Sequence, residues 1–198
     1  PDQLVGKMSL LVASFMVGVF LAVFGQEYQT GADTHGLFFG WAILALPWVL
    51  CALFEPLWIL WLVILSTGLV LFWKDVLMHP PTPWPWPYLL LILAGLHAVA
   101  LLMKETLAAR GWTWLEARWS RLWLLFVTLG TTTALPCLLL IDFRMDEARH
   151  VAVGAVGWLL LAGASFWLYR YRLKDAAAMS LALLSAGVVA TTTAARWL

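Results

Sequence analysis

Seven long apolar stretches constrain the fold of this chain more than any other feature. A helix needs roughly 20 mostly apolar residues to cross the hydrocarbon core of a bilayer, and each stretch approaches that length. Unpaired backbone groups are not tolerated in hydrocarbon, so each stretch is predicted to be a helix. The stretches run approximately over residues 8–25, 36–54, 56–73, 87–103, 121–141, 150–169 and 176–195. The sequence therefore predicts an all-α fold, a polytopic transmembrane bundle of about seven helices.

The low charge content agrees with a membrane environment. Charged residues make up 12% of the chain, whereas ordinary soluble domains carry about 25%. No basic stripe with interleaved stacking aromatics is present, so no nucleic-acid partner is expected. The lipid bilayer is the expected partner. We expect residues 1–198 to form a single transmembrane domain, and the start at Pro1 suggests a longer parent chain.

Lysine and arginine are distributed unequally between the two ends of the predicted helices. If the amino terminus is cytoplasmic, the inner side holds eight of these residues and the outer side holds four. The inner set is Lys7, Lys104, Arg110, Arg118, Arg121, Arg170, Arg172 and Lys174, and the outer set is Lys74, Arg144, Arg149 and Arg196. Because cytoplasmic connections carry the excess of basic residues, residues 25–35 are predicted to lie on the outer side.

Two connections have unusual compositions. The segment "KETLAARGWTWLEARWSR" (104–121) mixes tryptophans with basic residues and is expected to lie along the lipid headgroups. The segment "HPPTPWPWPY" (79–88) contains five prolines, so it is predicted to be a stiff, non-helical outer loop. Trp84 and Trp86 would project from this loop and are candidate contacts for a ligand or partner. A rigid connection without a binding role is the simpler alternative.

The polar run "FGQEYQTGADTHG" (24–36) separates the first two apolar stretches. Its carboxylates and its one imidazole, His35, would share the outer side with His79 and with the loop residues Asp142, Asp146, Glu147 and His150. Such groups can bind a metal or a cationic ligand. No fixed-spacing metal signature accompanies them, so solvated loop polarity is the alternative and neither a metal nor a cofactor is predicted.

His97 lies near the middle of the fourth apolar stretch, where an ionisable side chain is costly and usually faces the bundle interior. In the predicted orientation Thr131, Thr132 and Thr133 lie at a similar depth in the fifth stretch. A neutral His97 that hydrogen bonds to a threonine would satisfy both groups. The alternatives are a proton relay or a cofactor ligand at His97, or a solute pathway past His97 and the three threonines. A single mid-membrane histidine does not support bis-histidine haem ligation.

The run "FGQEYQTGADTHGLFFGWAILALPW" (24–48) resembles a bacterial membrane-protein family, domain of unknown function 2157. The resemblance is clear over roughly residues 8–60. It rests on Gly25, Gln26, Tyr28, Gln29, Gly31 and Asp33, which match the family's GQ-x-YQTGAD pattern. It implies a multi-pass protein of the bacterial inner membrane, but no activity. In such a membrane the distribution of lysine and arginine predicts residues 25–35 on the periplasmic side. Glu27 departs from the pattern, which counts against an essential acid or base at that position.

The matched polar residues favour binding over catalysis. Gln26, Tyr28, Gln29 and Asp33 are suited to hydrogen bonding a polar ligand or to fixing the shape of the loop. The leading hypothesis is a non-catalytic binding or accessory subunit of a membrane complex. Its partners would be the other membrane-protein subunits of that complex. A small-solute transporter is the alternative, because Pro47 and Pro136 both interrupt helices. An enzyme that acts on a lipid comes third, since no GxSxG, phosphate-binding glycine loop or CxxC is present.

Overall fold

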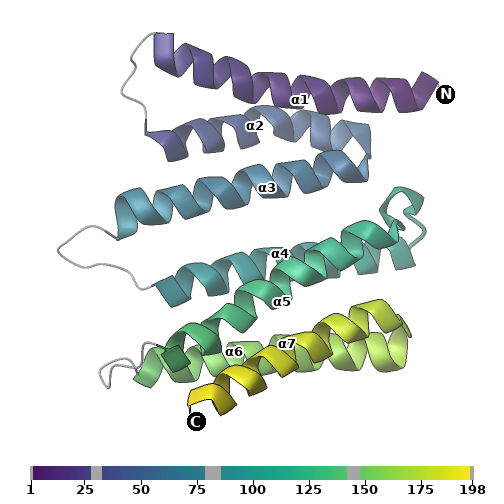
Figure 1. The fold of residues 1–198 in the computed structure, drawn as a ribbon. Helices are drawn as coiled ribbons and strands as arrows, with labels where there is room; N and C mark the ends of the chain where they lie inside the picture. Colours follow the sequence, from purple (N-terminus) through teal and green to yellow (C-terminus); the bar gives the residue numbers. More distant parts are fainter. Residues whose placement is uncertain (1, 28–32, 79–85, 142–147, 197–198) are drawn as a thin grey trace. The chain divides into compact units, whose positions relative to one another are not determined.

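The computed structural model describes residues 2–27, 33–78, 86–141 and 148–196. Within these residues all regular structure is helical, which confirms the predicted fold class. The long helices are α1 (Asp2–Glu27), α2 (Thr34–Ala52), α3 (Glu55–Phe72), α4 (Trp86–Ala109), α5 (Arg118–Ile141), α6 (Ala148–Trp167) and α7 (Ala176–Arg196) (Figure 1). In the described part of the chain, seven helices are long and apolar enough to cross a membrane. The chain is therefore a polytopic membrane protein.

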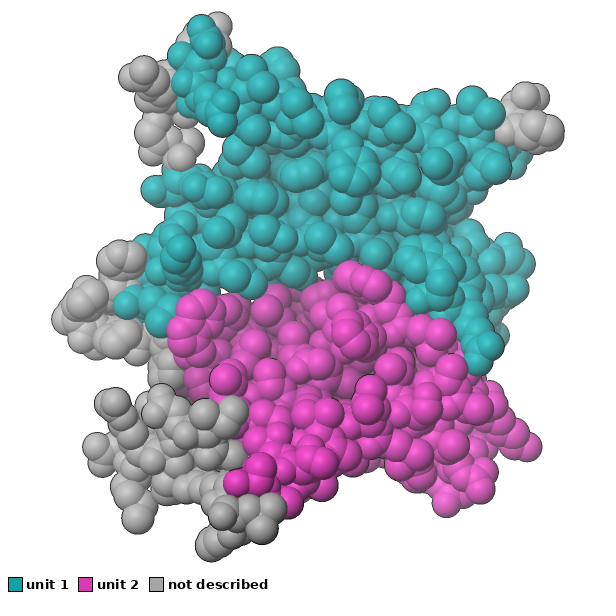
Figure 2. All heavy atoms as spheres, viewed as in Figure 1, with its two compact units in different colours: residues 1–84, 107–120 teal, residues 85–106, 121–198 magenta. Residues whose placement is uncertain are grey.

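Three short helical segments complete the described structure. Two are π-helical: η1 (Trp73–Leu77) continues α3 and η4 (Leu168–Arg172) continues α6. The third, η2 (Thr113–Leu115), is a 3₁₀ turn between α4 and α5. The helices form two compact units, which Figure 2 colours separately. Unit 1 comprises residues 1–84 and 107–120, and unit 2 comprises residues 85–106 and 121–198.

Unit 1 contains α1, α2 and α3, which run side by side in alternating directions (Figure 1). Indole groups connect neighbouring helices. Trp41 Nε1 of α2 donates to the carbonyl of Ser14 in α1 at 2.7 Å, and Trp61 Nε1 of α3 donates to the carbonyl of Ala42 at 2.9 Å. A Cβ atom on Gly18 would lie 2.6 Å from the Trp41 ring, so α1 can approach α2 only because glycine stands there.

A tight reversal joins α2 to α3 at one end of unit 1. Leu53 ends α2 with a φ of 45°, in the left-handed region, and its carbonyl accepts a hydrogen bond from Lys7 Nζ at 3.3 Å. Glu55 begins α3, and its buried carboxylate accepts a hydrogen bond from Ser120 Oγ at 2.5 Å. These bonds hold α1, the α2–α3 turn and the start of α5 together at this end.

Unit 2 is held together by polar contacts near one end of its helices. Arg121 of α5 makes a two-point ion pair with Glu105 of α4, with N–O distances of 2.5 and 3.3 Å. Its Nη1 lies 3.6 Å from Asp175 Oδ2. Asp175 also caps α7, because its Oδ1 accepts from the backbone N–H of Ala177 at 3.1 Å. One arginine therefore links α4, α5 and the start of α7.

The proline-rich segment differs from its prediction at its carboxyl end. Residues 86–88 are not loop, because α4 begins at Trp86 and includes Pro87. Proline is accepted in the first turn of a helix, where its missing N–H would have no intrahelical partner. The part of the segment before Trp86 lies outside the described residues.

The connection predicted over residues 104–121 is shorter in the structure. Helix α4 continues to Ala109, and α5 begins at Arg118. The residues that extend α4 include Lys, Glu, Leu and Ala, all strong helix formers, so the charged run did not end the helix. Leu115 is buried, whereas Trp112 and Trp119 are about half exposed. Only the middle of the segment therefore connects the two helices.

Candidate functional site

The candidate site lies at the end of unit 1 where α1 ends and α2 begins. Gln26 and Glu27 close α1 and are exposed. Asp33 precedes α2, and its backbone carbonyl accepts a hydrogen bond from the N–H of Gly36 at 2.9 Å. Its side chain makes no capping hydrogen bond and is 76% exposed. The first turn of α2 is thus fixed by backbone contacts, which leaves the Asp33 carboxylate at the surface.

His35 lies between two carboxylates in the first turn of α2. Its Nε2 is 4.0 Å from Asp33 Oδ2, and its Nδ1 is 3.8 Å from Asp75 Oδ2. Asp75 comes from the π-helical segment η1, and π-helical turns recur at functional sites. The ring also meets Phe72 edge-on, at 5.4 Å between centroids. We call Asp33, His35 and Asp75 the His35 cluster.

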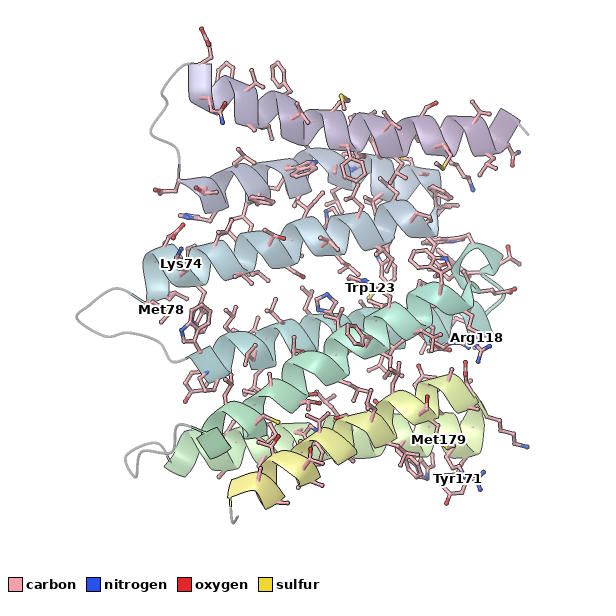
Figure 3. All side chains as sticks on the ribbon, in the orientation of Figure 1. Lys74, Met78, Arg118, Trp123, Tyr171 and Met179 are labelled. Atoms are coloured by element: carbon pink, nitrogen blue, oxygen red, sulfur yellow. The ribbon has the colours of Figure 1, made fainter. Side chains whose placement is uncertain are left out.

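The sequence did not reveal Asp75 as a partner of His35. The available signal was its place at the end of the third apolar stretch, on the side predicted for residues 25–35. Figure 3 labels Lys74 and Met78 at this end of unit 1 and Arg118 at the opposite end. The His35 cluster is suited to binding a cationic or hydrogen-bonding group. Among the described residues, no group of three or more His, Cys, Asp or Glu side chains could hold a metal ion.

A groove of about 850 Å³ opens between α1 and α2 beside the His35 cluster. Four glycines line it: Gly18 and Gly25 in α1, and Gly36 and Gly40 in α2. Its other lining residues are Leu21, Ala22, Phe24, Gln26, Thr34, Leu37, Phe38 and Trp41. A Cβ atom on Gly36 or Gly40 would meet nothing within 4 Å. The groove is therefore open at Gly36 and Gly40, its lining is mostly apolar, and Gln26 and Thr34 are its polar residues.

The structure brings some of the predicted site residues together and separates others. Gln26 lines the α1–α2 groove, and Asp33 belongs to the adjacent His35 cluster. Trp86 begins α4 in unit 2 and is 42% exposed. Tyr28, Gln29 and Trp84 lie outside the described residues, as do His79, Asp142, Asp146, Glu147 and the side chain of His150. Their predicted roles stay predictions.

The structure describes all four of the predicted intramembrane polar residues, His97 and Thr131–Thr133. His97 is buried, and its Nδ1 donates to the carbonyl of Leu93 at 2.8 Å. Its ring lies 5.7 Å from that of Trp123, which Figure 3 labels. The predicted hydrogen bond from His97 to a threonine stays a prediction. Thr131 and Thr132 each donate to a carbonyl four residues earlier, at 2.8 Å, and Thr133 pairs with Ser185 at 2.6 Å. Threonine in a helix can satisfy its own hydroxyl in this way.

The comparisons with known proteins identify one segment of the chain. No curated protein and no solved structure matches this chain. The matched segment contains α1, α2 and the whole α1–α2 groove, which agrees with the resemblance seen in the "GQEYQTGAD" run. Residues 2–58 of this chain match the family described as "Predicted membrane protein (DUF2157)".

Proposed function

We propose that this protein is a non-catalytic accessory subunit of a membrane complex, and that its α1–α2 groove receives a transmembrane helix of a partner subunit. The main support for this proposal is the free space at Gly36 and Gly40: a Cβ atom added to either glycine would meet nothing within 4 Å. The polar surface beside the groove, with Gln26 and the His35 cluster, would contact polar groups of the same partner.

Two other glycines in unit 1 lie at close helix–helix contacts within this chain. A Cβ atom on Gly18 would strike the Trp41 ring at 2.6 Å, and one on Gly68 would lie 3.1 Å from Phe39. Those glycines pack helices of this chain against each other. Gly36 and Gly40 have the G-x-x-x-G spacing that brings transmembrane helices into close contact, yet no described helix occupies them. A helix from another subunit would use this surface.

The location proposed for the protein is the bacterial inner membrane, with the His35 cluster on the periplasmic side. The excess of lysine and arginine on the other side supports this orientation. We also keep the proposal that residues 1–198 act as one transmembrane domain. A small-solute transporter with a pathway past His97 and Thr131–Thr133 stays the alternative proposal; the hydroxyls of these threonines contact carbonyls of their own helix or Ser185.

The test compares two glycine substitutions that are equally easy to accommodate in this chain. Gly40→Leu would block the groove, whereas Gly6→Leu places the same side chain in open space on α1 away from it. Both variants are expressed in place of the wild-type chain, extracted in mild detergent, and analysed for companion proteins. Gly40→Leu is expected to lose the companions that wild type and Gly6→Leu retain. If Gly40→Leu retains all of them, the groove is not the docking surface.

A further inference from the structure

We propose that unit 2 contains a separate binding site for a lipophilic molecule that carries a hydroxyl group. The site is a cavity of about 330 Å³ between α5 and α7, a volume near the lower end of the range for ligand pockets. Its walls are apolar apart from Thr133, Ser185 and Cys137. Every lining residue belongs to unit 2, so the site is independent of the α1–α2 groove.

The polar wall of the cavity is a directed chain of hydrogen bonds. Thr133 Oγ1 lies 2.6 Å from the carbonyl of Leu129 and 2.6 Å from Ser185 Oγ. Thr133 has one hydroxyl hydrogen and a carbonyl can only accept, so both contacts are hydrogen bonds only when Thr133 donates to Leu129 and Ser185 donates to Thr133. Ser185 in turn accepts from Trp158 Nε1 at 2.9 Å. Both hydroxyl hydrogens are therefore committed within the protein.

This commitment sets the chemistry of the ligand. Thr133 and Ser185 each keep an unused oxygen lone pair, and neither has a hydrogen left to donate. A ligand that offers a hydroxyl can donate to these oxygens. A ligand that offers only an ether or carbonyl oxygen would leave its own acceptor unpaired in an apolar cavity, which is unfavourable. The site therefore selects alcohols or phenols over ethers and ketones.

The ligand would enter from the lipid phase. Phe126 and Leu184 line the cavity and are 60% and 62% exposed on helices that span the membrane. Ser185 lies near the middle of α7, at a depth that a phospholipid headgroup does not reach. A Cβ atom on Gly130 would meet nothing within 4 Å, so the cavity is open at that wall. The cavity is therefore suited to an apolar chain or ring that carries a hydroxyl at mid-membrane depth.

Cys137 gives the experiment its reporter. It lines the cavity, while the other cysteine, Cys51, is exposed in unit 1 and serves as an internal control. The full chain is reconstituted in liposomes and treated with a membrane-permeant maleimide, with or without dodecanol or dodecyl methyl ether. Modification of each cysteine is followed by mass spectrometry. Dodecanol is expected to slow modification of Cys137 and leave that of Cys51 unchanged.

The ether tests the hydrogen-bond argument. Loss of one donated hydrogen bond should weaken its protection of Cys137 about two- to tenfold relative to dodecanol. Replacing both acceptors, with Thr133→Val and Ser185→Ala together, should remove the difference between the two compounds. Equal protection of wild type by alcohol and ether would overturn the assignment of a hydroxyl ligand. No protection by either compound would overturn the site itself.

A second measurement does not depend on thiol reactivity. Native mass spectrometry counts dodecanol molecules retained by the wild-type protein and by Gly130→Leu, which would fill the open wall of the cavity. Gly163→Leu is the control, because a Cβ atom there also meets nothing and Gly163 does not line the cavity. Wild type and Gly163→Leu should retain one more dodecanol than Gly130→Leu. Equal retention by all three would contradict the proposal.

Discussion

The indole N–H of Trp41, a residue that lines the groove, donates to the backbone carbonyl of Ser14 at 2.7 Å, and this bond links α2 to α1. Trp41→Phe keeps an aromatic ring and removes the donor. We expect a loss of about 0.5–1.5 kcal/mol in stability, the usual net contribution of one hydrogen bond. Thermal unfolding in detergent measures it. Trp119→Phe, at a half-exposed ring, is the control and should change nothing.

Gly18 and Gly40 should respond oppositely to the same substitution. In Gly18→Ala the new methyl group would lie 2.6 Å from the Trp41 ring, and overpacking of this kind costs about 1–3 kcal/mol. In Gly40→Ala the methyl group would meet nothing, and alanine favours helix by up to about 1 kcal/mol. Unfolding of the isolated protein should show the first variant weakened and the second unchanged or strengthened. Equal effects would mean that the α1–α2 packing described above is wrong.

The ion pair between Arg121 and Glu105 should give a measurable coupling energy between the two side chains. Arg121→Met leaves the Glu105 carboxylate, only 12% exposed, without the arginine that faces it. Breaking a fully buried pair costs about 3–5 kcal/mol, and partial exposure reduces this, so we expect about 1–3 kcal/mol. Adding Glu105→Gln to Arg121→Met should recover part of the loss. A double-mutant cycle by chemical unfolding gives the coupling energy, and strict additivity would show that the pair is not coupled.

His97 separates the accessory-subunit proposal from the transporter alternative. If the protein acts as an accessory subunit, His97→Ala should leave the set of companion proteins unchanged, because His97 lies in unit 2 and the groove lies in unit 1. Co-purification from the native membrane measures this. Retained companions together with a solute uptake abolished by His97→Ala would favour the transporter instead.

The sequence was sufficient for the architecture. Seven apolar stretches of spanning length predicted the seven helices, because hydrocarbon leaves the backbone no alternative to the helix. Helix ends were less predictable. The prolines before Tyr88 suggested a loop up to that residue, but Pro87 fits the first turn of α4. Charges at Lys104 and Glu105 suggested a helix end, but both residues favour helix and α4 continues to Ala109.

The site was predicted only in part, because its partners are tertiary. The "GQEYQTGAD" pattern drew attention to Gln26 and Asp33, and both lie at the α1–α2 end of unit 1. The approach of Asp75 to His35 depends on the π-helical end of α3, which has no sequence signature here. The pairing of Thr133 with Ser185 joins residues 52 positions apart. No periodicity or motif could have matched them.

The most direct test of the accessory-subunit proposal is the native mass of the wild-type protein after gentle extraction from its own membrane. The chain described here accounts for 22.1 kDa. We predict a much larger particle that contains identifiable companion subunits. The Gly40→Leu variant is expected not to assemble into this particle. A lone monomer, or an assembly of this chain alone, would contradict the proposal.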